Sequence, residues 1–203
     1  MGSVDNSEVP RTPGPFPTAI KILVAGGFGA GKTTFVSAVS EVEPLCTEEL
    51  LTQVSAATDS LHGVEAKSTT TVAMDFGRLT LGPEHVLYLF GTPGQERFWF
   101  LWDELSTGAL GAVVLADTRR LEHCFAAVDF FERRGIGFLV AVNEFDGAPH
   151  RYGPEEVRRA LDLRPEVPVA LCDARENASG IRILMSLVEH LLNTRSSHVT
   201  DAV

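Results

Sequence analysis

The residues best suited to chemistry in this sequence form a glycine-rich stretch, GGFGAGKTT, at positions 26–34. The stretch matches the pattern G-x-x-x-x-G-K-[ST] and stands between an apolar run and a helical pattern, the context in which this motif binds nucleotide phosphates. Glycines let successive backbone N–H groups turn toward an anion, and the start of a helix adds its dipole. Lys32 is then expected to reach the β- and γ-phosphates, and the Thr33 hydroxyl to ligate magnesium. The expected phosphate-binding residues are Gly26, Gly27, Phe28, Gly29, Ala30, Gly31, Lys32, Thr33 and Thr34.

A second motif, NEFD at 143–146, follows an apolar run and resembles the N-K-x-D sequence of GTPases. In those proteins the aspartate accepts hydrogen bonds from guanine N1–H and N2–H, and the asparagine braces the phosphate loop. Asn143 and Asp146 are therefore expected to select guanine. Glu144 replaces the lysine and is expected to weaken affinity without changing the base. The residues CDAR resemble the S-A-K loop, whose alanine N–H meets guanine O6, and add Cys172, Asp173 and Ala174 to the expected nucleotide-binding residues.

Two further stretches resemble the segments of GTPases that respond to the terminal phosphate. TVAMDF matches TIGVDF in residue type and spacing, which predicts Thr71 as the threonine that closes over the γ-phosphate and magnesium. Thr70 is the alternative. FGTPGQERF, at 90–98, predicts that the Gly94 N–H meets the γ-phosphate and that Gln95 is the catalytic residue that orients the attacking water.

The same stretch lacks one carboxylate, because Gly91 stands where the GTPase sequence DTAGQERF has an aspartate. That aspartate would hold the water shell of magnesium. Thr71 and Asp75 fall on one face of a predicted strand that lies next to the strand ending at Gly91. We therefore expect Asp75 to join Thr33 and Thr71 at the metal as an outer-sphere group. The alternatives are that Asp75 caps a strand or pairs with Arg78.

Together these motifs resemble the small Ras-like GTPases, and most closely the bacterial MglA-like branch and the GTP-binding proteins of actinobacterial conservon operons. The resemblance covers residues 19–193 and includes the departure at position 91. It implies a small regulatory GTPase that binds GTP with magnesium and hydrolyses it slowly to GDP as a conformational switch in bacterial signalling. It also implies two protein partners, a roadblock-fold activator and a sensor-kinase-like membrane protein.

Other functions stay open at this point. Gly91, together with the bulky Phe28 in the phosphate loop, argues against fast turnover, so a pseudo-GTPase that holds nucleotide as a scaffold is the alternative. A P-loop kinase or ATPase acting on a small molecule would leave Asn143 and Asp146 unexplained. The aromatic run FWFLWDEL, at 98–105, predicts either core residues or an anchor surface for an effector.

The elements that must position these motifs alternate between apolar runs and helical patterns. This order predicts an α/β fold with a doubly wound, mostly parallel six-stranded sheet that has one antiparallel strand. Gly82-Pro83 joins the two strands of an antiparallel hairpin, and the polar stretch at 43–70 predicts a long functional loop, the first switch region. Residues 1–18 are expected to be a disordered tail, 19–193 the domain and 194–203 a flexible tail.

Composition limits the partners. With 27 acidic and 17 basic residues, the formal net charge of −10 repels nucleic acid and anionic lipid, and no basic run offsets it. No apolar run is long enough to span a membrane, and the first residues lack the apolar core of a signal peptide. The three cysteines have no metal-type spacing. We expect a cytoplasmic protein that reaches a membrane only through a partner.

Overall fold

The computed structural model describes residues 16–43, 45–52, 69–94, 98–147 and 150–200. The strands are β1 (Thr18–Gly26), β2 (Leu45–Thr52), β3 (Thr69–Thr80), β4 (His85–Gly91), β5 (Gly111–Ala116), β6 (Phe138–Asn143) and β7 (Val169–Cys172). The helices are α1 (Lys32–Val39), α2 (Leu101–Ser106), the 3-10 helix η2 (Leu121–Cys124), α3 (Phe125–Arg134), α4 (Pro154–Ala160) and α5 (Asn177–Thr200).

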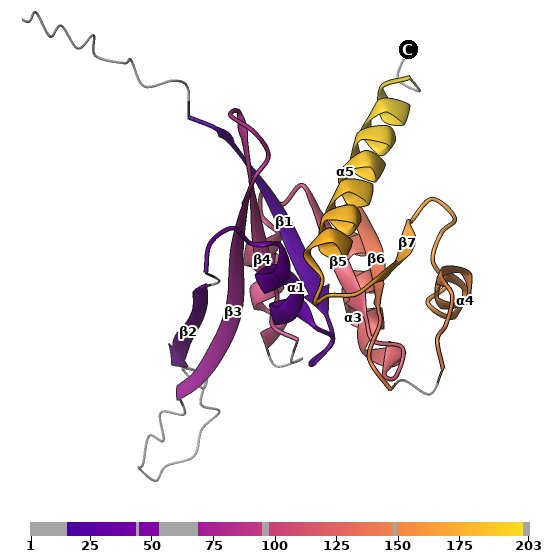
Figure 1. Cartoon of the computed structure of the whole chain (residues 1–203), viewed down its shortest axis with the longest axis horizontal. Helices are drawn as coiled ribbons and strands as arrows, with labels where there is room; N and C mark the ends of the chain where they lie inside the picture. Colours follow the sequence, from indigo (N-terminus) through magenta and orange to yellow (C-terminus); the bar gives the residue numbers. More distant parts are fainter. Residues whose placement is uncertain (1–15, 44, 53–68, 95–97, 148–149, 201–203) are drawn as a thin grey trace, which may run out of the picture.

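The described strands form one sheet in the order β2-β3-β4-β1-β5-β6-β7 (Figure 1). β3 runs antiparallel to both of its neighbours, β2 and β4, while the other adjacent pairs are parallel. The predicted α/β fold, with a mostly parallel sheet and one antiparallel strand, is confirmed.

β2 is a strand that the sequence analysis did not predict. It lies inside the stretch predicted as a loop and pairs with β3, from Leu45 opposite Phe76 to Thr52 opposite Thr69. The sheet therefore has seven strands, the six expected ones and β2. β2 is an edge strand of this sheet. Continuous apolar runs are typical of central strands that are buried on both faces, and the buried strands were predicted from such runs. An edge strand does not need such a run, so this signal did not reveal β2. The rest of that predicted loop, 53–68, lies outside the described residues.

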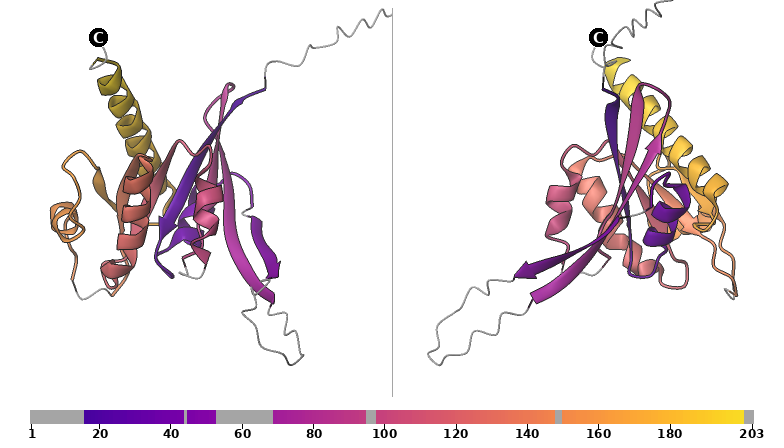
Figure 2. Two further views of the ribbon diagram at one scale, coloured as in Figure 1. Left: turned by 180° about the vertical axis from the view of Figure 1, so that it is seen from behind. Right: turned by 60° about the vertical axis from the view of Figure 1, so that its left-hand side comes forward.

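Helices cover both faces of the sheet. Figure 1 shows α1 and α5 in front of it, and the view from behind in Figure 2 brings α2 and α3 forward. Ile22 and Val24 of β1 belong to the core that includes α1 and α5, whereas Leu23 and Ala25 belong to the core that includes α2, α3 and α4. Burial on both faces explains why β1 is continuously apolar from Ile22 to Ala25.

The ends of the chain differ in part from the predicted boundaries. α5 continues past Asn193 to Thr200, so the predicted flexible tail is helical up to that residue. No glycine or proline occurs between 181 and 200 to end the helix earlier. Most of the predicted N-terminal tail lies outside the described residues. Among the helices that the structure describes, none is long and apolar enough to cross a membrane.

Candidate nucleotide-binding site

The carboxyl ends of the parallel strands meet at one edge of the sheet, and the loops that follow β1, β5, β6 and β7 lie there. Open α/β sheets bind their ligands at this edge. Three of these loops carry the predicted motifs, because GGFGAGKTT follows β1, NEFD spans the end of β6 and CDAR spans the end of β7. The fold therefore brings the phosphate motif and both base motifs together.

The phosphate loop leads from β1 directly into α1. Gly26, Gly29 and Gly31 have φ values of 137°, 76° and 101°, a region that side chains disfavour. At Gly31, a Cβ atom would also lie 2.6 Å from the side-chain nitrogen of Asn143. The glycine pattern of the motif is thus required both by the backbone conformation and by a neighbour from β6.

Lys32 is buried at the start of α1, with 9% of its surface exposed. Its ammonium group donates hydrogen bonds to the carbonyls of Gly26 (3.0 Å) and Gly27 (2.8 Å). Burial lowers the pKa of Lys32 to about 8, although nearby Asp75 acts in the opposite direction. Gly94 lies against this group, because a Cβ atom at Gly94 would come within 2.7 Å of Nζ. Lys32 and Gly94, predicted to meet the same phosphate, are therefore neighbours.

Asp75 lies beside the predicted metal ligand Thr33, whose hydroxyl donates a hydrogen bond of 2.8 Å to Oδ2 of Asp75. Phe76 of β3 pairs with Phe90 of β4, which makes Asp75 and Gly91 neighbours across the same two strands. A Cβ atom at Gly91 would lie only 2.9 Å from both Cβ and Oδ2 of Asp75. The carboxylate of Asp75 thus fills the space that a side chain at position 91 would need.

The switch residues are only partly described. The backbone of Thr71 lies in β3 opposite Leu50, and that of Thr70 lies opposite Leu51, but their side chains are not described. Gln95 lies outside the described residues. Their predicted roles stay predictions.

Asn143 braces the site as predicted. Its side-chain nitrogen donates to the Ala30 carbonyl (3.0 Å), and its side-chain oxygen accepts from the Ala174 N–H (3.0 Å). One buried amide therefore connects the phosphate loop, the loop after β6 and the loop after β7. The Ala174 N–H, predicted to meet guanine O6, is engaged by Asn143 in this structure, and its contact with a base stays a prediction.

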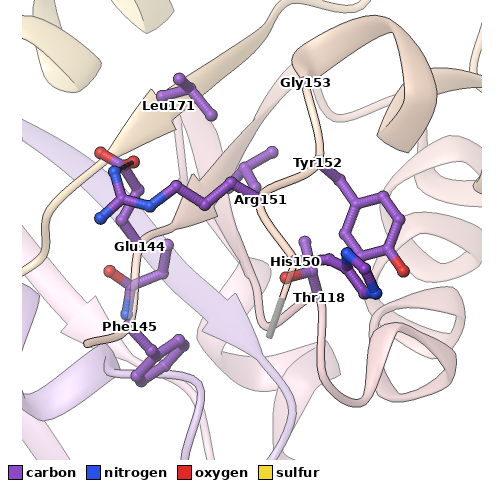
Figure 3. Close-up of a pocket in the computed structure, with 10 residues that line it drawn as sticks. Thr118, Glu144, Phe145, His150, Arg151, Tyr152, Gly153 and Leu171 are labelled. Atoms are coloured by element: carbon purple, nitrogen blue, oxygen red, sulfur yellow. Dashed lines mark hydrogen bonds and ion pairs between the residues drawn. The ribbon is translucent and has the colours of Figure 1, made fainter. Parts of the chain in front are cut away.

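The other residues of the base motifs form ion pairs. Asp146 pairs with Arg175, whose hydrogen bonds hold the pKa of Asp146 below its usual value and lower the pKa of Asp173 to about 2. Glu144 pairs with Arg151 (3.1 Å) beside a pocket of about 240 Å³ between the loop after β6 and β7 (Figure 3). Cys172 is buried, and burial raises the pKa of its thiol to about 11, which is typical of a packing residue.

The loop after β5 contains residues near the phosphate loop that the sequence analysis missed. Buried Asp117 binds Arg119 through two hydrogen bonds of 2.8 Å and pairs with Arg120 at 3.5 Å. The guanidinium group of Arg120 lies 3.0 Å from the place where a Cβ atom of Gly29 would be. The signal in the sequence was DTRR directly after an apolar run, at the edge where parallel strands place functional groups.

The aromatic run after the second switch is divided between core and surface. Phe98 and Trp102 are buried, and the Trp102 indole donates a hydrogen bond of 3.1 Å to the Pro93 carbonyl. Trp99 and Phe100 are exposed. Phe98 and Trp102 therefore agree with the core interpretation, and the anchor surface for an effector stays a prediction that only the exposed residues of the run could serve.

Comparisons with solved structures agree on the fold. The cytosolic domain of the T. maritima FeoB iron transporter in a GDP form is 17% identical, with a TM-score of 0.62, over 88% of this chain and 65% of that chain. The G domain of FeoB from Methanococcus jannaschii is 12% identical, with a TM-score of 0.57, over 85% of this chain and 97% of that chain. The chain thus has the fold of a G domain and spans about two thirds of the FeoB cytosolic domain.

Sequence comparisons identify the family. An uncharacterized protein of Methanocaldococcus jannaschii is 29% identical over 129 residues, which cover 63% of this chain and 71% of that protein. The predicted place in the MglA-like branch and the link to conservon operons stay predictions. Residues 24–194 match a family described as "Conserved hypothetical ATP binding protein", and because this match covers most of the chain, the protein belongs to that family.

Proposed function

We propose that this chain is a small regulatory GTPase that binds GTP with magnesium, hydrolyses it slowly to GDP and acts as a conformational switch in bacterial signalling. The observation that carries the proposal is the brace at Asn143, which bonds to Ala30 of the phosphate loop and to Ala174 of the last loop. Through this brace, the groups suited to phosphate and those suited to a base belong to one site.

Selection of guanine is assigned to Asp146, which follows Asn143 in the same loop and is exposed to solvent. A carboxylate accepts two hydrogen bonds side by side, and guanine offers two such donors at N1–H and N2–H. Adenine offers an acceptor at N1 instead. We expect a preference for guanine of at least about a hundredfold.

Two other candidates have specific support. The description of the family names ATP, which favours adenine binding. A pseudo-GTPase that works as a scaffold is favoured by Gly91 and by Phe28, which is 64% exposed within the phosphate loop. The base motif argues against adenine binding. Gln95 argues against the pseudo-GTPase, because the role proposed for this residue is to orient the water that attacks the phosphate during hydrolysis.

The residues at the phosphate end fit magnesium, which takes oxygen ligands and keeps several of its waters. Thr33 would ligate the ion, together with Thr71 when the first switch closes. Asp75, in hydrogen-bond contact with Thr33, would hold the water shell from the outer sphere. When bound, magnesium neutralises the charge that develops on the phosphate oxygens.

Hydrolysis is assigned to groups around the γ-phosphate. Lys32 meets the charge of the phosphates, the Gly94 N–H binds a γ-phosphate oxygen and Gln95 orients the attacking water. Gln95 lies outside the described residues, and we expect the bulky side chain of Phe28 in the phosphate loop to crowd it and any arginine that a partner inserts. Slow turnover without an activator follows from this crowding.

Partner binding is assigned to the exposed aromatic side chains Trp99 and Phe100, which follow the second switch closely in the chain. Aromatic residues are frequent anchors in protein interfaces. A roadblock-fold activator and a sensor-kinase-like membrane protein are the proposed partners, on the ground of the resemblance alone.

The test begins with GTP and ATP titrations of the purified chain, followed by phosphate release with and without a roadblock-fold partner. Gln95→Ala should bind GTP like the wild type and hydrolyse it more slowly, because Gln95 orients water only for the reaction. Equal affinities for ATP and GTP would exclude guanine selectivity. Phosphate release no faster than in Lys32→Ala would favour the scaffold.

A further inference from the structure

Arg175 lies between two carboxylates that come from different loops. Its guanidinium group pairs with both oxygens of Asp146, through Nη1 to Oδ2 and through Nη2 to Oδ1 at 3.3 Å. It also binds Asp173, through Nε to Oδ1 at 2.9 Å and through Nη2 to Oδ2 at 2.7 Å. Both oxygens of the carboxylate assigned to base recognition are therefore engaged by a side chain.

The donor pattern of Arg175 matches that of the base. A guanidinium group presents N–H donors side by side in one plane, a fork that fits a carboxylate. The Watson–Crick edge of guanine presents N1–H and N2–H in the same way. We propose that Arg175 is an internal competitor of guanine, which occupies Asp146 in the nucleotide-free protein and lowers its affinity for guanine nucleotides. This inference rests on the proposed function, in which Asp146 recognises guanine.

When Arg175 releases Asp146, it keeps Asp173 as a partner. Asp173, two residues earlier in the same loop, keeps two side-chain hydrogen bonds and also accepts the Arg175 backbone N–H at 3.0 Å. The side chains of Asp146 and Arg175 are 79% and 52% exposed, so water reaches both. Ion pairs this exposed are weak and exchange readily. Guanine can therefore take Asp146 while Arg175 stays on Asp173.

The competing interpretation of the same contacts is that Arg175 is a structural bridge between the two loops. Such a bridge would position Asp146 for the base, and removal of the Arg175 side chain would weaken nucleotide binding. A competitor behaves in the opposite way, because its removal frees the carboxylate. The sign of the change in affinity therefore separates the two interpretations.

The experiment starts from the purified full chain after its nucleotide has been removed. Fluorescent GDP is bound first, and its displacement by unlabelled GDP gives the GDP affinity. Arg175→Ala should bind GDP about twofold to fivefold more tightly than the wild type, the range expected for loss of an exposed ion pair. Arg175→Lys should lie between the two, because an ammonium group lacks the planar fork. Arg182→Ala is the matched control, since it removes the same charge from an exposed position of α5. Loss of positive charge alone should weaken binding of an anionic nucleotide or leave it unchanged.

Arg175→Ala that binds GDP as weakly as the wild type, or more weakly, would overturn the inference. The proposed function is tested separately, by the ratio of GDP to ADP affinity in the wild type. A wild type that prefers GDP, combined with an Arg175→Ala variant that gains nothing, would leave the proposed function standing and remove the competitor. A wild type that prefers ADP would remove the proposed function itself.

Discussion

The phosphate end and the base end of the site are built in different ways. At the phosphate end, Lys32 and Asp75 are both buried; Lys32 donates to two backbone carbonyls, and Asp75 accepts from Thr33. At the base end, Asp146 and Arg175 are largely exposed, and they pair with each other across two loops. The first end depends on buried polar contacts and the second on exposed charge pairs.

This difference predicts how each end responds to ligand and to mutation. A buried polar group that loses its partner destabilises the protein, because no water replaces the lost contact. An exposed ion pair exchanges with solvent at little cost. The phosphate end is therefore fixed before nucleotide arrives, whereas the base end can change partners on binding.

The largest effect is expected at Lys32. Lys32→Ala should abolish nucleotide binding, because it removes the buried cation beside the phosphate loop, and fluorescent GDP titration measures this. Lys21→Ala is the control, since Lys21 donates to the Thr107 carbonyl, outside the phosphate and base motifs. Binding by Lys32→Ala at wild-type strength would contradict the fixed phosphate end.

Asp146→Asn tests the base end with the next largest effect. GTP affinity should fall by about a hundredfold or more, because the variant offers guanine one acceptor and one donor instead of two acceptors. Xanthine nucleotide, which presents a matching acceptor, should gain affinity. Competition of GTP, ATP and XTP against one fluorescent nucleotide gives all three values. An unchanged order of the three would place base recognition elsewhere.

Asp75→Ala tests the proposal that Asp75 replaces the carboxylate missing at position 91. The magnesium concentration for half-maximal GTP binding should rise about tenfold to a hundredfold, the usual cost of losing an outer-sphere partner. Gly91→Asp alone should destabilise the fold, since its Cβ atom would meet Asp75 at 2.9 Å. The swap Asp75→Gly with Gly91→Asp removes that clash and should recover part of the magnesium affinity. A magnesium titration of Asp75→Ala that matches the wild type would show that the ion does not depend on this residue.

The smallest effect concerns pH at Lys32, whose pKa is lowered by burial to about 8. Bound phosphate favours the charged lysine, so binding at pH 8 should take up about half a proton and binding at pH 7 almost none. GDP affinity should fall about twofold between pH 7 and pH 8 for this reason. Calorimetry in buffers of different ionisation enthalpy measures the uptake. No uptake at pH 8 would mean that Lys32 is fully charged before nucleotide binds.

The sequence predicted the phosphate loop and the brace at Asn143 because each motif is a short run of residues after an apolar strand. From the alternation of residues along a strand it also predicted that Asp75 lies near Thr33 and Gly91, as the structure has it, while the role of Asp75 at the metal stays a prediction. It missed β2, whose residues lack the apolar pattern, and gave no role to Arg175 or Arg120. The places of these arginines at the site depend on neighbours in other loops, Asp146 for Arg175 and Gly29 for Arg120, and neither residue belongs to a periodic pattern.

By itself, the sequence determined the local conformation of this protein. Glycine spacing sets the phosphate loop, and runs of apolar residues set the buried strands, because these preferences act over a few neighbouring residues. Only the tertiary structure decided which distant groups meet. Asp146 and Arg175, which the sequence analysis did not pair, are 29 residues apart in the chain. Such contacts exist because the sheet order and register bring separate loops to one edge, which no local preference specifies.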